Sequence, residues 1–289
     1  MRVRRHESAL GRWEMAHGTP HPALRGQVLR YCGYSEDTAA PLRRREVAAP
    51  ELTVIFSFGP SIDVVDAAGR GGRFRSFVAG LDDSYAETEH AGHQCGLELK
   101  LSPLAARRLL GVPGRELAGR VVALDDVLGR PADELAERLA GAPGWPARFA
   151  ILDSVLTHRL VRAPSIATDV AHAWRRMVAS HGRVSVAGLA DEVGWSRRHF
   201  GARFRQHVGL APKPAARVVR FRRAIELLER DDGARLAAIA QDCGYYDQAH
   251  FNRDFRAFAG SSPSDHLGRR LPDGGGVAGA GVSSVASSA

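Results

Sequence analysis

The stretch from 244 to 266, GYYDQAHFNRDFRAFAGSSPSDH, carries side chains whose types suit hydrogen bonding to the edges of nucleic-acid bases. Gln248 and Asn252 stand four residues apart, and Arg253 follows directly. A glutamine or asparagine amide can form two hydrogen bonds with adenine, and an arginine guanidinium can bond guanine or phosphate. On a helix these residues would share one broad surface. The stretch therefore points to contact with nucleic acid, provided that a helix turns this surface outward.

Three phenylalanines at helical spacing would orient such a helix. Phe251, Phe255 and Phe258 stand at positions i, i+4 and i+7 and form an apolar stripe that must pack on a core. The opposite face then carries Ala249, Arg253 and Arg256, with Gln248 and Asn252 on its flanks. The pattern predicts a helix that is anchored by aromatic rings and presents hydrogen-bonding groups to a partner.

An internal repeat supports this interpretation. The segment 189–212, LADEVGWSRRHFGARFRQHVGLAP, matches the segment 239–263, IAQDCGYYDQAHFNRDFRAFAGSSP. Gly194 matches Gly244, and in each copy two phenylalanines four residues apart follow, with one extra residue after the glycine in the second copy. Each copy predicts a helix, a tight turn at the glycine and a second helix, which is the pattern of a helix-turn-helix. The second helix of such a unit enters the major groove of DNA.

The second helix of the first copy presents a different outward surface. Its outward residues are Arg197, Arg198, Gly201, Ala202 and Arg205. Gly201 has no side chain and Ala202 has only a methyl group, so neither can read a base by hydrogen bonding. We therefore expect this helix mainly to grip backbone phosphates, and the second copy to read bases.

The charge of the chain is concentrated in the same region. The net charge is +8, and residues 171–270 hold 18 Arg or Lys against 10 Asp or Glu. Residues 1–170 hold 22 against 21 and are almost neutral. A basic segment beside a neutral one predicts a polyanionic partner for the basic segment, although a well-solvated basic surface would give the same count.

An amphipathic segment links the two copies. The pattern of 214–230, PAARVVRFRRAIELLER, predicts one helix with an apolar stripe and several arginines on its other sides. If both units enter successive major grooves on one side of a duplex, this helix must hold them about 34 Å apart. We expect Arg220 on this helix to contact phosphate.

The other segments predict an α+β chain in four parts. Residues 1–20 look loose, and the β-rich runs and helices of 21–165 predict a sensing or dimerisation domain. Residues 166–270 read as an all-α domain, and the Gly/Ser/Ala-rich residues 271–289 as a disordered tail. The helix expected at 146–161 could pair with a second subunit, but packing on its own domain is the favoured interpretation.

Residues 174–270 resemble the DNA-binding domain of the AraC/XylS family of bacterial transcription regulators. The resemblance rests mainly on IAQDCGYYDQAHFNRDFRAFAGSSPSDH, where the Ile-Ala pair, glycines, phenylalanines and Pro263 fall at the family's spacing. It implies two helix-turn-helix units joined by a long helix. It also implies these base-facing positions: Arg198, Gly201 and Ala202 in the first unit, and Gln248, Ala249, His250, Asn252 and Arg253 in the second.

Other chemistry is less well supported by the sequence. His90, His93 and Cys95 are soft ligands that could hold zinc, but strand alternation would place His90 on the opposite face from the other two. Cys32 could be a nucleophile, although the Pro-Cys-His-Arg context of DNA-repair alkyltransferases is absent. We expect no catalytic residue, no metal and no cofactor. A DNA-targeted enzyme that uses residues 1–165 is the alternative.

The sequence therefore predicts a sequence-specific transcription regulator rather than an enzyme. Its expected partners are double-stranded promoter DNA, and further RNA polymerase, a small-molecule effector and a second subunit. Activation is the expected action, while repression stays open. No apolar run approaches the roughly 18 residues of a membrane span, and a bacterial cytoplasm is the expected location.

Overall fold

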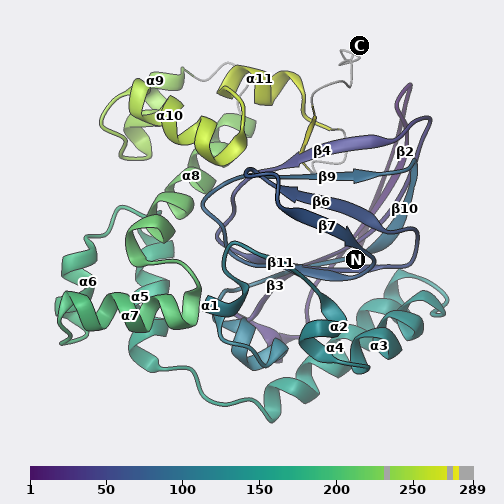
Figure 1. Cartoon of the computed structure of the whole chain (residues 1–289), viewed down its shortest axis with the longest axis horizontal. Coiled ribbons are helices and arrows are strands. Elements are labelled where there is room, and N and C mark those ends of the chain that lie inside the picture. Colours follow the sequence, from purple (N-terminus) through teal and green to yellow (C-terminus); the bar gives the residue numbers. More distant parts are fainter. Residues whose placement is uncertain (231–234, 272–275, 280–289) are drawn as a thin grey trace.

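The computed structural model describes residues 1–230, 235–271 and 276–279. A β-rich N-terminal domain is followed by a helical C-terminal domain, as the sequence predicts (Figure 1). Within the described residues, no helix combines the length and the apolar character needed to cross a membrane.

The larger sheet of the described chain is antiparallel and has the strand order β1-β2-β3-β10-β5-β8-β11. Its strands are β1 (Arg2–Ser8), β2 (Gly11–Gly18), β3 (Val28–Thr38), β5 (Leu52–Ser57), β8 (Phe77–Ala79), β10 (His93–Leu101) and β11 (Val121–Ala123). The smaller sheet has the order β12-β4-β9-β6-β7. Its strands are β4 (Leu42–Glu46), β6 (Ile62–Asp66), β7 (Gly71–Phe74), β9 (Ala86–His90) and β12 (Val277–Ala278).

The central strands of the larger sheet are buried on both faces. In β5, Val54 and Phe56 belong to the core that the sheet shares with the helices, whereas Ile55 packs with Ile62 and Val64 of the smaller sheet. Successive residues of a strand point to opposite faces, so one strand supplies both cores. This explains why the run LTVIFS is apolar without alternation.

Helices cover the face of the larger sheet that lies away from β6 (Figure 1). The segments are a short helix at Pro22–Leu24, a π-helix at Ala106–Leu110, α1 (Gly114–Leu117), α2 (Leu124–Leu128), α3 (Pro131–Ala140) and α4 (Trp145–Val161). The stripe of α4 that includes Phe149, Leu152 and Leu156 is buried in this core. The helix therefore packs on its own domain, as favoured from the sequence.

Two expectations about the chain ends were wrong. Residues 1–20 are not loose, because β1 and β2 form a hairpin and Trp13 and Ala16 of β2 are buried. In the predicted tail, β12 pairs with β4, and Leu271 is buried beside Trp13. The rest of that tail, 272–275 and 280–289, lies outside the described residues.

The C-terminal domain is helical, and a segment without helix at 162–167 precedes it. Its helices are α5 (Thr168–Ala179), α6 (Val186–Glu192), α7 (Arg197–Val208), α8 (Pro212–Arg230), α9 (Leu236–Asp242), α10 (Gln248–Ala259) and α11 (Pro263–Gly268). The long helix α8 joins two groups of helices, α5–α7 and α9–α11 (Figure 1). One end of α8 shares a core with α7, and the other end shares a core with α9 and α10.

Candidate nucleic-acid interface

The turns between α6 and α7 and between α9 and α10 are built alike. Gly194 and Gly244 adopt left-handed backbone angles, with φ of 68° and 76°. In each turn, the N–H of the aromatic residue after the glycine donates to the carbonyl of an alanine five residues earlier, Ala190 or Ala240, at 2.9 Å. This is the hydrogen bond of a Schellman motif, which ends a helix and redirects the chain. The repeat in the sequence is thus a structural repeat of two helix-turn-helix units.

Both second helices begin at a side-chain cap. The Ser196 hydroxyl accepts a hydrogen bond from the His199 N–H at 3.2 Å. The Asp247 carboxylate accepts one from the His250 N–H at 2.6 Å. Each cap satisfies a backbone N–H that has no partner inside the helix. The starting residues of α7 and α10 are therefore fixed locally.

The buried face of α10 contains a charge that the sequence did not indicate. Phe251, Phe255 and Phe258 are fully buried, as predicted. Asp254 is also buried, and its carboxylate accepts a hydrogen bond from Arg217 of α8 at 2.8 Å. The position of Asp254, three residues after Phe251 and four before Phe258, placed it on the apolar stripe. A carboxylate on an apolar stripe needs a buried partner, so this position could have indicated the ion pair from the sequence.

The outward face of α10 holds the predicted side chains in two groups. Gln248, Ala249 and Arg253 are exposed. His250 is half-buried, because its ring packs edge-on against Tyr245 with a centroid distance of 5.2 Å. The Oδ1 atom of Asn252 is buried and has no hydrogen-bond partner in the described part of the chain. Gln248, Ala249 and Arg253 are therefore open to a partner, whereas His250 and Asn252 lie partly against their own helix-turn-helix unit.

The outward face of α7 is open, and arginines surround it. Arg197, Arg198, Ala202 and Arg205 are exposed. A Cβ atom added to Gly201 would meet nothing within 4 Å, so the glycine is not required by packing. Its effect is to leave the backbone of α7 accessible for close approach by a partner.

Four outward arginines keep their hydrogen-bonding capacity for a partner. They are Arg197, Arg198, Arg205 and Arg253, and none of them has a hydrogen bond or ion pair to another described residue. A guanidinium has five N–H donors and stays charged at all physiological pH values. These side chains can therefore engage phosphates or guanine edges without first breaking an internal contact.

Most arginines of α8 have partners within the protein instead. Arg222 and Arg223 pair with Glu226 of the same helix. Arg220 donates to the carbonyl of Gly182 at 3.2 Å, and its guanidinium lies over the ring of Tyr245 at 5.5 Å. These contacts connect the first helical group to the second unit, and they favour a structural role for Arg220 over the phosphate contact expected from the sequence.

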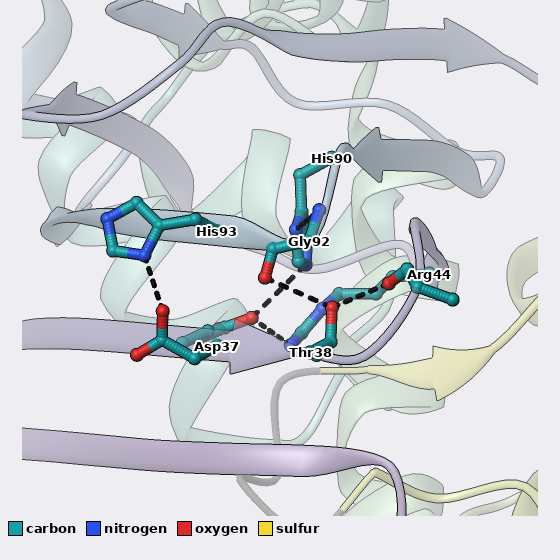
Figure 2. A network of polar contacts seen from close by, with 8 residues as sticks. Asp37, Thr38, Arg44, His90, Gly92 and His93 are labelled. Atoms are coloured by element: carbon teal, nitrogen blue, oxygen red, sulfur yellow. Dashed lines mark hydrogen bonds and ion pairs between the residues drawn. The ribbon is translucent and has the colours of Figure 1, made fainter.

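The residues weighed for other chemistry do not converge. The His90 ring lies 3.4 Å from Glu36, whereas His93 contacts Asp37 at 2.7 Å on another side (Figure 2). Among the described residues, no group of three or more His, Cys, Asp or Glu side chains is placed to hold a metal ion. Cys32 is 4% exposed, so its sulfur is not open to a substrate.

A pocket in the N-terminal domain is too small for an ordinary ligand. It lies between the larger sheet and helices α3 and α4, has a volume of about 50 Å³, and is lined by leucines, Phe56 and Arg159. Pockets that bind drug-sized molecules measure roughly 300–1,000 Å³. Burial lowers the pKa of Arg159, and its Nε donates to the Leu109 carbonyl at 2.7 Å.

Comparison with known proteins identifies the C-terminal region. A family model described as a helix-turn-helix domain matches residues 189–269, which extend from α6 to α11. An uncharacterized HTH-type transcriptional regulator of Haemophilus influenzae is 36% identical over 78 residues, which are 27% of this chain and 26% of the relative. The HTH-type transcriptional activator RhaS of Escherichia fergusonii is 34% identical over 82 residues, 28% of this chain and 29% of the relative.

The chain spans between a quarter and a third of the length of the curated relatives it matches. The solved structure of ToxT from Vibrio cholerae aligns with 83% of this chain and 98% of its own chain, at 10% identity and a TM-score of 0.49. Both curated relatives are described as transcriptional regulators. Residues 189–269 of this chain therefore match a helix-turn-helix domain, and the chain is similar over part of its length to transcriptional regulators.

Proposed function

We propose that this chain is a bacterial transcription regulator that binds promoter DNA through α7 and α10. The observation that carries the proposal is the structural repeat. Two helix-turn-helix units with the same turn and the same type of cap present outward arginines that have no internal partner. A helix of this kind fits the major groove, and unpaired guanidinium groups suit the phosphates that border it.

The two units would have different roles in DNA recognition. Gln248 and Arg253 of α10 are exposed and can form bidentate contacts with adenine and guanine. In α7, two of the predicted outward positions are Gly201 and Ala202, which offer no hydrogen-bonding side chain. We infer that α10 reads bases and that α7 mainly holds the backbone.

The N-terminal domain contacts both units and is suited to influence their arrangement. Arg45 of β4 donates to the carbonyl of Gly260 at the end of α10 at 2.7 Å, and the Ala48 N–H donates to the Phe258 carbonyl at 2.9 Å. On the other side, α1 packs against the end of α7. We propose that an effector or a partner that shifts this domain changes DNA occupancy. An effector of ordinary size would have to widen the pocket at Arg159.

Selection of bound fragments from a pool of random duplexes tests the function directly. The full chain should enrich a short motif, and footprinting on that motif should protect two major-groove segments about one helical turn apart. Double-stranded DNA that is retained without enrichment would indicate a nonspecific binder. A chain that retains no duplex at low salt would contradict the proposal.

RNA polymerase contact, a second subunit and a cytoplasmic location remain part of this proposal. They follow from the regulator role, since a regulator of bacterial promoters acts where polymerase and DNA are found. In vitro transcription from a selected fragment would show the direction of the effect, for which activation is the expected outcome.

A further inference from the structure

Helix α1 of the N-terminal domain is in backbone contact with the end of α7 (Figure 1). A Cβ atom on Gly114 would lie 2.3 Å from the His207 carbonyl oxygen. A Cβ atom on Gly209 would lie 3.0 Å from the Gly114 carbonyl oxygen. Such distances leave no room for side chains, so these two glycines allow the close approach. The residue after Gly114 is thereby held at a fixed place beside α7.

An open groove lies between these two helices. Its volume is about 550 Å³, and its lining residues are Arg115, Glu116, Ala202, Arg203, Arg205 and Gln206. Ala202 and Arg205 belong to the outward face of α7 that we assign to DNA. The groove therefore continues the proposed interface from the C-terminal domain onto the N-terminal domain.

The groove is basic. It contains three guanidinium groups, and its one carboxylate, Glu116, lies 3.9 Å from Arg115. The Arg115 side chain is 55% exposed, which leaves most of its donors facing solvent. The pKa of the neighbouring His207 is lowered, first by burial and then by the positive charges of Arg203 and Arg107. The surroundings of His207 are therefore basic as well.

We propose that this groove holds the sugar-phosphate backbone of the duplex whose major groove receives α7, with Arg115 as a phosphate ligand supplied by the N-terminal domain. The proposal rests on the DNA-binding function proposed above. A helix in the major groove, about 12 Å wide, has a phosphate strand on each side, so a basic groove next to that helix meets one of them. A groove this open would leave a small anion largely exposed, which favours an extended polyanion.

A salt titration with matched variants tests this assignment. The full chain is titrated with a short, labelled random-sequence duplex, and the affinity is measured by fluorescence anisotropy at several salt concentrations. In Arg115→Ala, the slope of log affinity against log salt should decrease in magnitude by about 1, and at about 0.1 M salt the affinity should fall about five- to tenfold. Arg115→Lys should keep the slope, because it keeps the charge.

Two further variants make the test specific. Arg130→Ala removes an arginine whose side chain is 92% exposed, from the start of α3 in the same domain, and should leave the slope unchanged. Glu116→Gln removes the carboxylate of the groove and should tighten binding about two- to fivefold, because a negative charge beside phosphate is unfavourable. A structural role for Arg115 would not produce this gain.

The outcomes separate the two proposals. The groove assignment is wrong if the wild type binds duplex but Arg115→Ala keeps the full salt slope. It is also wrong if Arg130→Ala reduces the slope as much as Arg115→Ala does. In both cases the proposed regulator function is unaffected. If the wild type binds no duplex, both fall. Equal unfolding midpoints of the variants exclude misfolding as the cause, and Glu116→Gln decides the question if Arg115→Ala is unstable.

Discussion

Arg253 and Arg198 are both exposed and unpaired, but they occupy different surroundings. Arg253 is flanked by Gln248 and Asn252 on α10, whereas Arg198 stands before Gly201 and Ala202 on α7. The same side chain can thus take part in base reading in one unit and in phosphate binding in the other. Residue type alone does not distinguish these roles, and the neighbours on the helix face do.

Arg253→Ala should reduce the affinity for a selected site by about 1–3 kcal/mol and reduce the affinity for random duplex much less, because a bidentate contact with one base is lost. Arg198→Ala should reduce both affinities by a similar factor, because a phosphate contact carries no sequence information. Competition binding with specific and random duplexes measures the ratio. Equal losses for Arg253→Ala would remove its base-reading role.

Arg220 shows which residue-level contacts the sequence does not reveal. The sequence shows an arginine on a basic amphipathic helix, but the structure directs it to the Gly182 carbonyl and the Tyr245 ring. Those partners lie 38 and 25 positions away, so local periodicity cannot reveal them. The outward arginines were predictable, because their helices have clear aromatic stripes that determine the exposed face.

Arg220→Ala should therefore lower the unfolding midpoint and leave the salt dependence of DNA affinity unchanged. The loss removes a hydrogen bond and a cation–π contact, and each contributes about 1 kcal/mol. Thermal unfolding and the salt titration, measured on one preparation, separate the two roles. A salt slope that decreases in magnitude by about 1 would restore the phosphate contact expected from the sequence.

At the scale of elements, apolar strands were predictable and charged strands were not. The runs that became β3, β5, β6, β8 and β10 are rich in Val, Ile, Leu and aromatic residues. The sequences RVRRHES, LRRRE and AETEH, which form β1, β4 and β9, have no apolar pattern. In the sheet, β4 and β9 face each other with opposite charges, as in the pairs Arg43–Glu89 and Arg45–Glu87. The sequence feature that indicates these two strands is the opposite charge of two segments that lie about 45 residues apart.

The glycines of the two turns allow a matched comparison. A Cβ atom on Gly194 would meet nothing within 4 Å, so Gly194→Ala carries only the cost of a left-handed alanine, about 1–2 kcal/mol. A Cβ atom on Gly244 would also lie 3.1 Å from the Cδ of Arg183, so Gly244→Ala should cost more. Gly268→Ala, in open space without a positive φ, should be neutral or slightly stabilising.

Chemical denaturation gives the unfolding free energy of each of these variants. The order of stability should be Gly268→Ala, then Gly194→Ala, then Gly244→Ala. If Gly194→Ala is as stable as Gly268→Ala, then the first turn does not depend on its left-handed residue.

At the scale of the whole molecule, the N-terminal domain holds each DNA-binding unit at the end of its second helix. One contact is α1 with the end of α7, and the other is the segment from Arg45 to Ala48 with the end of α10. The domain order was predictable from the sequence, but these contacts were not, since they join residues more than 90 positions apart. They matter for function because the distance between α7 and α10 decides which DNA sites both can reach.

Arg45→Ala should loosen the second unit without affecting the first. Arg45 is mostly buried, donates to the Gly260 carbonyl at 2.7 Å and also pairs with Glu87. Loss of a charged donor to a carbonyl costs about 1.5–3 kcal/mol, which corresponds to at least about tenfold faster local opening. Hydrogen exchange should therefore accelerate in peptides at the end of α10, while peptides of α7 keep their protection.

Arg43→Ala is the matched control for this change. Arg43 lies on the same strand and pairs with Glu89, but its side chain makes no hydrogen bond or ion pair to α10 among the described residues. Exchange at the end of α10 should stay at the wild-type rate in this variant. If Arg45→Ala also leaves that rate unchanged, the β4 contact does not stabilise the second unit. The position of α10 would then depend on its other contacts, which include the Asp254–Arg217 pair and the phenylalanine core.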